Sequence, residues 1–196
     1  MTTTQKIQWR HDIMGARAEA EASHGQKMVL IECFSPTCIS CKNMEERTWS
    51  DEKVQQILET ETVPVQLNVL EDASLGKPPL LAFWTPTLIA MCKDGNIHRR
   101  WEGFLPPHEF LGELALSRVA YALARQDFDE AHRLAQEATQ WTQNDELRHS
   151  ESLYWQAVAA YKASENQDLL IAGWKDLLAR FPHSEWAKRV DFAASL

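Results

Sequence analysis

Cysteine is scarce in this sequence, with only four in 196 residues. Small secreted domains that depend on disulfides for their stability are far richer in cysteine, so a disulfide scaffold is excluded. Only Cys38 and Cys41 stand at the spacing of a recurrent motif. In a reducing compartment, such a pair is typical of a catalytic or a metal-binding site.

Long hydrophobic runs are also missing. The longest apolar stretch, residues 78–91, has prolines at its start and in its middle. It is too short to cross a bilayer, which takes about 20 residues. Residues 1–10 lack the apolar segment of a secretion signal. We therefore expect a cytoplasmic protein that is neither secreted nor embedded in a membrane.

Basic residues are too few to balance the acidic ones. The chain has 20 Lys and Arg against 28 Asp and Glu, a formal net charge of -8. This charge repels phosphate backbones and anionic lipids, so we expect neither nucleic acid nor a membrane as a partner. The apolar fraction of 44% is enough for one large core or two small ones.

The first half of the chain alternates between helical and strand patterns. Its predicted elements are, in order, a helix over 2–25 that stops at Gly25, a strand over 28–34, a helix from Cys38, a helix capped by Ser50 or Asp51, a strand over 63–69, a loop or short helix over 71–81, and a hairpin of strands 87–92 and 97–102. Ser35, Pro36 and Thr37 break the first strand, so the cysteine pair is predicted to open a helix.

The second half contains no strand pattern after Pro107. Helical segments are predicted over residues 107–125, 127–141, 145–164, 167–181 and 183–194. This change of pattern predicts two domains, over residues 1–113 and 114–196.

The second domain carries a degenerate repeat. Seven of its residues fall at the spacings of a tetratricopeptide repeat: Tyr154, Val158, Tyr161, Leu170, Trp174, Leu177 and Pro182. Leu170 and Trp174 replace the small and aromatic residues usual there, and fewer than two full repeats are present. We expect a tetratricopeptide-like all-α domain that is capped by the first domain or by a second chain.

The spacing of Cys38 and Cys41 at a helix start favours thiol chemistry. The free N–H groups of a first helical turn stabilise an anion, and a thiolate is the form that attacks a disulfide. We expect Cys38 to be the nucleophile and Cys41 the cysteine that resolves the mixed disulfide. A zinc site is the alternative, but Cys33 and Cys92 lack a partner at a suitable spacing, and no histidine pair supplies further ligands.

A longer set of residues resembles the thioredoxin superfamily. The resemblance rests on the string from Val29 to Lys42, on Glu46 to Asp51 followed by Val54, on Thr85-Pro86-Thr87, on Asp94-Gly95 and on Gly103-Phe104. It covers about residues 10–113 and is strongest to the C-terminal thioredoxin-like domain of transmembrane disulfide reductases. It implies an α/β fold, the thioredoxin fold, with a mixed sheet of four or five strands flanked by helices.

The same resemblance implies roles for four further residues. Pro86 would be a cis-proline that faces the cysteine pair, and Thr85 before it would hold an extended substrate through its backbone. Thr37, next to Cys38, would also contact the substrate. Glu32 would be a buried acid that accepts the proton of Cys41, and its raised pKa would suit this role. The alternative for Glu32 is an exposed strand residue in water.

Two departures from the superfamily leave the direction of the reaction open. Thioredoxins have Trp before the first cysteine and Gly-Pro between the two, whereas this chain has Thr37 and then Ile39-Ser40. Reduction, oxidation and isomerisation of disulfides all stay open.

The remaining conspicuous residues are expected to serve packing. Cys33 should be a core residue on the sheet face opposite Glu32. Cys92 is expected at a strand end, partly exposed, with a regulatory disulfide as the less favoured role. The isolated histidines 108, 132, 149 and 183 are expected at the surface or at helix ends.

Two functional hypotheses follow. The favoured one is an enzyme, a thiol–disulfide oxidoreductase without a cofactor, acting on a protein disulfide or a redox partner that the helical domain helps to bind. The alternative is a non-catalytic adaptor or co-chaperone in which the thioredoxin-like domain is only a scaffold. Association of two chains is compatible with both.

Overall fold

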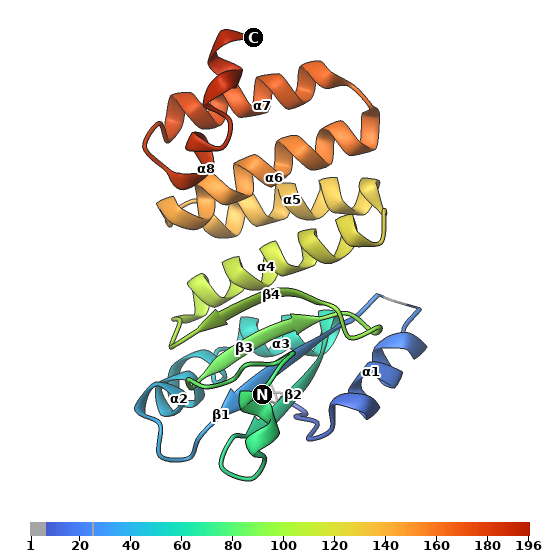
Figure 1. The fold of residues 1–196 in the computed structure, drawn as a ribbon, viewed down its shortest axis with the longest axis vertical. Coiled ribbons are helices and arrows are strands. Elements are labelled where there is room, and N and C mark those ends of the chain that lie inside the picture. Colours follow the sequence, from blue (N-terminus) through green and yellow to red (C-terminus); the bar gives the residue numbers. More distant parts are fainter. Residues whose placement is uncertain (1–6, 25) are drawn as a thin grey trace. The chain divides into compact units, whose positions relative to one another are not determined.

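The computed structural model describes residues 7–24 and 26–196 of the chain. Contacts divide the chain into two compact units, Met1–Phe110 and Leu111–Leu196. Figure 1 colours the first from blue to green and the second from green to red. The domain limits of 1–113 and 114–196 stay a prediction about independently folding parts.

The first unit is built on a four-stranded mixed sheet with the strand order β2-β1-β3-β4. The strands are β1 (Met28–Phe34), β2 (Thr62–Asn68), β3 (Thr87–Met91) and β4 (Ile97–Glu102). β1 runs parallel to β2 and antiparallel to β3, and β3 and β4 form the predicted hairpin. The predicted strands are therefore confirmed, with ends within about two residues, the usual uncertainty of such boundaries.

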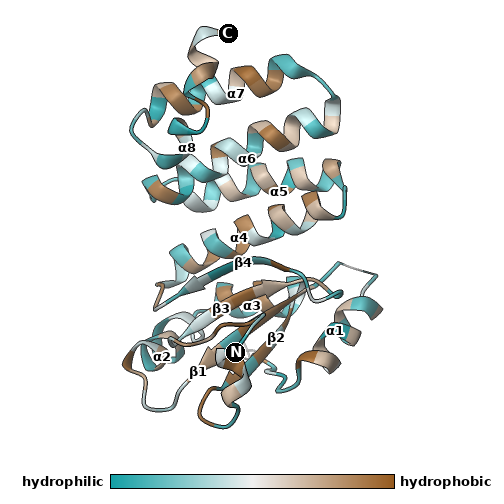
Figure 2. Ribbon diagram, viewed as in Figure 1, coloured by the Kyte–Doolittle hydropathy of each residue, from teal (hydrophilic) through white to brown (hydrophobic). Residues whose placement is uncertain are grey.

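Helices cover both faces of this sheet (Figure 1). They are α1 (Ile13–Ala22), α2 (Ile39–Asn43), the π-helix η1 (Met44–Thr48), α3 (Glu52–Glu61) and the short 3-10 helix η2 (Ala73–Gly76). The strands need cover on both faces because β1 is buried along nearly its whole length. The apolar character of β1 and β3 is visible as brown in Figure 2, whereas β4 is mostly teal. The predicted mixed sheet with flanking helices is confirmed.

Alternation along β1 divides its side chains between the two faces. Val29, Ile31 and Cys33 pack in one core cluster with Ala16 and Ala20 of α1. Glu32 therefore points to the opposite face, where Trp49, at the end of η1, donates a hydrogen bond to it. Strand β1 thus separates the apolar core from the face that carries the candidate site.

The predicted first helix is wrong in its early part. Helix α1 begins at Ile13, after Asp12, whose side chain accepts hydrogen bonds from the backbone N–H groups of Met14 and Gly15. Before it, Arg10 pairs with β2, with hydrogen bonds from Arg10 N to Pro64 O at 2.9 Å and from Gln66 N to Arg10 O at 2.8 Å. Backbone pairing with a strand distant in sequence excludes helix there. Residues 2–6 and the predicted stop at Gly25 lie outside the described residues.

The second unit is helical. Its elements are α4 (Pro107–Ala124), whose first residues belong to the first unit, α5 (Phe128–Thr142), α6 (Glu146–Ser164), α7 (Gln167–Arg180), α8 (Glu185–Lys188) and the 3-10 helix η3 (Asp191–Ser195). Small residues such as Ala115, Ala135 and Ala159 let α4, α5 and α6 approach closely in one core cluster. Four packed helices are therefore confirmed. The tetratricopeptide register stays a prediction.

The last predicted helix, over 183–194, is wrong as a single element. The chain leaves helical geometry at Val190, with φ of -129°, and resumes as a 3-10 turn. Ala187 and Val190 both pack in a cluster with Leu153 and Leu177. Burying these residues against α6 and α7 decides the path of the chain here. No helix in the described part of the chain is long and apolar enough to cross a bilayer.

Candidate functional site

Cys38 occupies the N-cap position of α2, as the sequence predicts. Its backbone is extended, and its sulfur accepts a hydrogen bond from the N–H of Cys41 at 3.1 Å. Burial raises the pKa of a thiol, but here hydrogen bonds from the side chains of Cys41 and Thr85 and from the N–H groups of Cys41 and Ser40 outweigh it. The pKa of Cys38 is therefore lowered, and this half-exposed sulfur is set up to form a thiolate.

Cys41 has the opposite properties. It is buried on the first turn of α2. Burial, followed by its hydrogen bond to Cys38, raises its pKa from 9.0 to about 12. Both cysteines are free thiols in this structure. The pair is thus asymmetric, with one sulfur inclined to ionise and the other inclined to keep its proton.

Glu32 is buried beside the pair, with only 1% of its surface exposed. One of its oxygens, Oε2, accepts hydrogen bonds from Trp49 Nε1 at 3.1 Å and from Gln66 Nε2 at 2.9 Å. Burial is the main cause that raises its pKa from 4.5 to about 7, while the two hydrogen bonds lower it. The alternative of an exposed strand residue is therefore wrong.

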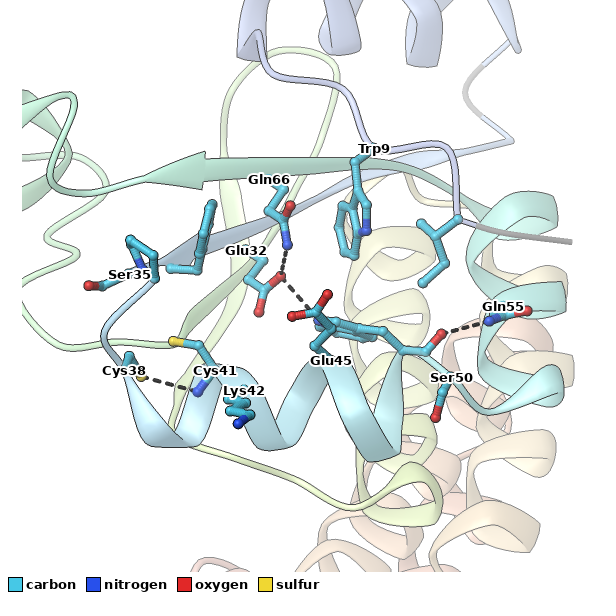
Figure 3. Close-up of a pocket in the computed structure, with 14 residues that line it drawn as sticks. Trp9, Glu32, Ser35, Cys38, Cys41, Lys42, Glu45, Ser50, Gln55 and Gln66 are labelled. Carbon is cyan, nitrogen blue, oxygen red and sulfur yellow. Dashed lines mark hydrogen bonds between the residues drawn. The ribbon is translucent and has the colours of Figure 1, made fainter. Parts of the chain in front are cut away.

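A cavity of about 580 Å³ connects Glu32 to the cysteine pair. Glu32, Cys38 and Cys41 all line it (Figure 3), together with Trp9, Lys42, Glu45 and Trp49 among others. A carboxyl group with a pKa near neutrality can take a proton from a neighbouring group and return it at physiological pH. The cavity therefore brings together a nucleophile, a second thiol and a proton acceptor.

The predicted substrate-binding residues lie around Cys38. The Cys38 thiol donates a hydrogen bond to the backbone carbonyl of Thr85 at 3.2 Å. The peptide bond between Thr85 and Pro86 is cis, as the resemblance implies. Thr37 is exposed, and its hydroxyl lies 3.0 Å from that of Ser35. The fold thus gathers all six predicted site residues at one end of β1, although their roles stay predictions.

Several features of the site were not foreseen. Trp49 and Gln66 carry the hydrogen bonds to Glu32, and only Gln66 has a signal in the sequence, since it pairs with Glu32 across the parallel strands. Large apolar side chains also lie exposed close in sequence to Cys38 and Thr85, with Ile39 exposed to 81%, Phe83 to 77% and Trp84 to 64%. Exposure of side chains like these is decided by tertiary packing and has no local signature.

The other cysteines are buried. Cys33 is fully buried in the core as predicted, and burial raises its pKa to about 12. Cys92 is only 5% exposed, so its predicted partial exposure is wrong. It follows Met91, the last residue of the interior strand β3, and its backbone groups bond to Asn96 and Gly95 in the turn. No cluster of His, Cys, Asp or Glu that could hold a metal occurs within residues 7–24 and 26–196.

His149 also differs from its predicted surface position. It is 6% exposed, and its ring nitrogens lie 3.2 Å from Thr142 Oγ1 and 2.7 Å from an Arg180 nitrogen. Its partners come from α5 and from the end of α7. His149 therefore joins three elements of the helical unit.

Comparisons with known proteins agree with this geometry. Residues 15–117 match the family described as thioredoxin-like domain. The structure is similar to a DsbH oxidoreductase, with a TM-score of 0.50 and 10% identity over 57% of this chain and 84% of that one. This likeness shows the fold alone.

Two further solved structures are similar. One is the oxidised C-terminal domain of Neisseria meningitidis DsbD, with a TM-score of 0.47 and 24% identity over 56% of this chain and 99% of that one. The other is a thioredoxin from Thermus thermophilus, with a TM-score of 0.49 and 30% identity over 57% of this chain and 86% of that one. A search of curated proteins found no match.

Proposed function

Because the chain belongs to the thioredoxin-like domain family, we propose that it is a thiol–disulfide oxidoreductase that works through Cys38 and Cys41. The observation that carries this proposal is the asymmetry of the pair. The pKa of Cys38 is lowered at a helix N-cap, whereas the pKa of Cys41 is raised by burial. A structural scaffold has no need of such a difference, and disulfide exchange depends on it.

The reaction consists of two exchanges. The Cys38 thiolate attacks one sulfur of a substrate disulfide, which breaks that bond and releases the other substrate sulfur as a thiolate. Cys41 then gives its proton to Glu32 and attacks the sulfur of Cys38, which releases the second substrate thiolate and leaves a Cys38–Cys41 disulfide. Two electrons pass from the enzyme to the substrate. The reverse sequence oxidises a substrate dithiol.

The substrate in this proposal is a protein disulfide or the dithiol of a redox partner. Thr85 would hold an extended segment of it through the backbone beside Pro86, since an extended chain can add to exposed backbone groups. Thr37 is exposed next to the nucleophile and would contact the same segment. The exchange needs no cofactor, because both electrons come from sulfur. We further propose a cytoplasmic location, without nucleic acid or membrane as a partner, in keeping with the net charge of -8.

The first test uses single replacements of the two cysteines. We expect Cys38→Ser to abolish disulfide exchange with a protein substrate such as insulin, because the nucleophile is lost. We expect Cys41→Ser to accumulate a mixed disulfide on Cys38, detectable by mass spectrometry as an adduct that dithiothreitol removes. Cys92→Ala, which changes a buried cysteine outside the site, serves as the control and should keep its activity. Undiminished exchange by Cys38→Ser would reject the proposal.

The adaptor hypothesis is supported by the helical unit. Its consecutive helices α5, α6 and α7 pack in order, and packed helix pairs commonly form protein-binding surfaces. The double variant Cys38→Ser/Cys41→Ser discriminates between the two functions. If the protein is an adaptor, cells that carry the double variant should keep the phenotype of cells with the natural protein. If it is an oxidoreductase, they should lose that phenotype.

A further inference from the structure

The two hydrogen bonds to Glu32 end on the same carboxyl oxygen. Trp49 Nε1 and Gln66 Nε2 both donate to Oε2, at 3.1 and 2.9 Å. Two donors on one oxygen stabilise negative charge there and fix the rotation of the carboxyl group. The other oxygen, Oε1, accepts neither of these two bonds and points toward the helix that carries Cys41 (Figure 3).

The two donors are held by independent parts of the fold. Gln66 is the register partner of Glu32 on the neighbouring parallel strand, so both side chains leave the sheet on the same face. Trp49 directly follows the π-helix η1, and its backbone N–H donates a hydrogen bond to Met44 O at 2.8 Å. Such π-turns are rare and often occur at functional sites.

The π-helix is itself fastened to the loop that follows β4. Thr48 Oγ1 donates to Leu105 O at 2.6 Å, and Leu105 N donates to Met44 Sδ at 3.4 Å. Gln55 Nε2 donates to Trp49 O at 2.8 Å and so holds the backbone of the tryptophan from α3. Trp49 is therefore fixed from several sides, and its indole N–H is directed at Glu32.

We propose that Trp49 and Gln66 are positioning residues, which occupy Oε2 of Glu32 and thereby make Oε1 the atom that takes the proton of Cys41 and returns it. The inference rests on the proposed function and adds to it which oxygen of Glu32 takes the proton and which residues fix that choice. The S–H bond of Cys41 breaks, its proton passes to Oε1 within the cavity that both residues line, and the sulfur is left with the electron pair that attacks Cys38. The reverse reaction returns the same proton.

Other charged groups face Glu32 across the cavity. Glu45, on η1, raises the pKa of Glu32 through repulsion between like charges. Lys42 lines the cavity from α2, but its ammonium lies 3.6 Å from Glu46 in an exposed ion pair. Cys38 and Cys41 complete the set of titratable groups. None of these groups donates a hydrogen bond to Oε2. The proposal therefore concerns Trp49 and Gln66, which do.

The test compares three conservative replacements in the full, reduced chain. Trp49→Phe and Gln66→Met each remove one donor and keep most of the volume. Trp9→Phe is the matched control, because Trp9 lines the same cavity and contacts Trp49 edge-on, with ring centroids 5.4 Å apart, without donating to Glu32. The midpoint of Glu32 is followed by carbon NMR of the glutamate carboxyl groups, with Glu32→Gln identifying its signal.

The donors stabilise the ionised carboxylate, so their removal should raise the midpoint. We expect an increase of about one pH unit for Trp49→Phe and for Gln66→Met. Trp9→Phe should leave the midpoint where it is. Gln66 is only partly buried, so its replacement keeps the test informative should Trp49→Phe fail to fold.

Reaction with an aromatic disulfide such as DTNB then separates the two exchanges. Release of the first aromatic thiol reports the attack by Cys38, and release of the second reports closure by Cys41. We expect Trp49→Phe and Gln66→Met to shift the pH profile of the second phase upward and to leave that of the first unchanged, whereas a merely structural role would shift neither.

Three results would overturn the inference, and they distinguish its failure from failure of the proposed function. Unchanged profiles in variants that still release both thiols, or an equal shift in Trp9→Phe, would reject the positioning role while the proposed function stands. Failure of the natural chain to release any thiol would reject the proposed function, and the proton transfer with it.

Discussion

At the scale of single residues, the candidate site depends on an ionisable group that is buried away from water. Glu32 is 1% exposed, and its pKa of about 7 expresses the free energy needed to hold a carboxylate in the protein interior. The folded state therefore binds the proton of Glu32 more tightly than the unfolded state does. This contribution to stability is fully present below the ordinary pKa of 4.5 and is lost as the pH rises through about 7.

Replacement of Glu32 should therefore stabilise the protein at alkaline pH. Glutamine keeps an acceptor for Trp49 and Gln66 but carries no charge. We expect Glu32→Gln to increase the free energy of unfolding at pH 8 by up to about 3 kcal/mol, and to change it little at pH 4. Urea titrations at the two pH values measure the difference.

Glu52→Gln is the control for this prediction, because Glu52 is exposed at the start of α3. It should change the free energy of unfolding by only a few tenths of a kcal/mol at either pH. Equal stability of Glu32→Gln and the natural chain at pH 8 would contradict the view that an ionised carboxylate destabilises this position.

At the scale of elements, close approach of helices sets the architecture of the second unit. Gly173 on α7 lies against α6, where an added Cβ would stand 2.6 Å from the Cβ of Ala157. Cβ atoms cannot come so close, so the helices must move apart to admit a side chain. Glycine is therefore required here by space, since Gly173 lies within a regular helix.

Gly173→Ala should destabilise the protein for this reason. Alanine favours helix over glycine by about 1 kcal/mol, but overpacking costs about 1–3 kcal/mol. We expect a net loss of about 1 kcal/mol in the free energy of unfolding, measured by thermal or urea denaturation. Gly76→Ala is the control, since no atom lies within 4 Å of its added Cβ. A stabilised Gly173→Ala variant would show that the two helices adjust freely.

The elements also show where sequence patterns succeed. A buried apolar run predicts β1, alternation predicts β2, and the turn before Ile97 predicts the hairpin. Of the two predicted caps of α3, Asp51 is the one that accepts hydrogen bonds from the backbone N–H groups of Lys53 and Val54. These signals are local, because each depends on residues a few positions apart. The early start predicted for α1 fails because Arg10 pairs with Pro64 and Gln66, more than fifty residues away. Helix propensity is a weak preference that such pairing overrides.

At the scale of the whole molecule, the chain contains separate cores. One cluster unites Ala16, Val29 and Ile89 in the first unit, and another unites Leu134, Ala138 and Ala159 in the second. Two cores of this kind can unfold separately, as domains of a larger chain often do.

We therefore expect two transitions in differential scanning calorimetry at pH 8. Glu32→Gln should raise the midpoint of one transition, and Gly173→Ala should lower that of the other, because each residue lies in a different unit. The double variant should show both shifts unchanged, since distant sites act additively. A single transition that both variants move would show that the two units unfold as one.

The sequence by itself determined where the cysteine pair lies. A strand, a turn with Pro36, and Cys38 and Cys41 at a helix start are all local features, so their spacing predicts the N-cap position that the structure shows for Cys38. Only the tertiary structure decided the environment of Glu32. Its donors Trp49 and Gln66 lie 17 and 34 residues away in the chain. Burial and hydrogen bonds between distant residues depend on how the strands and helices pack, and the pattern along a chain does not specify that packing.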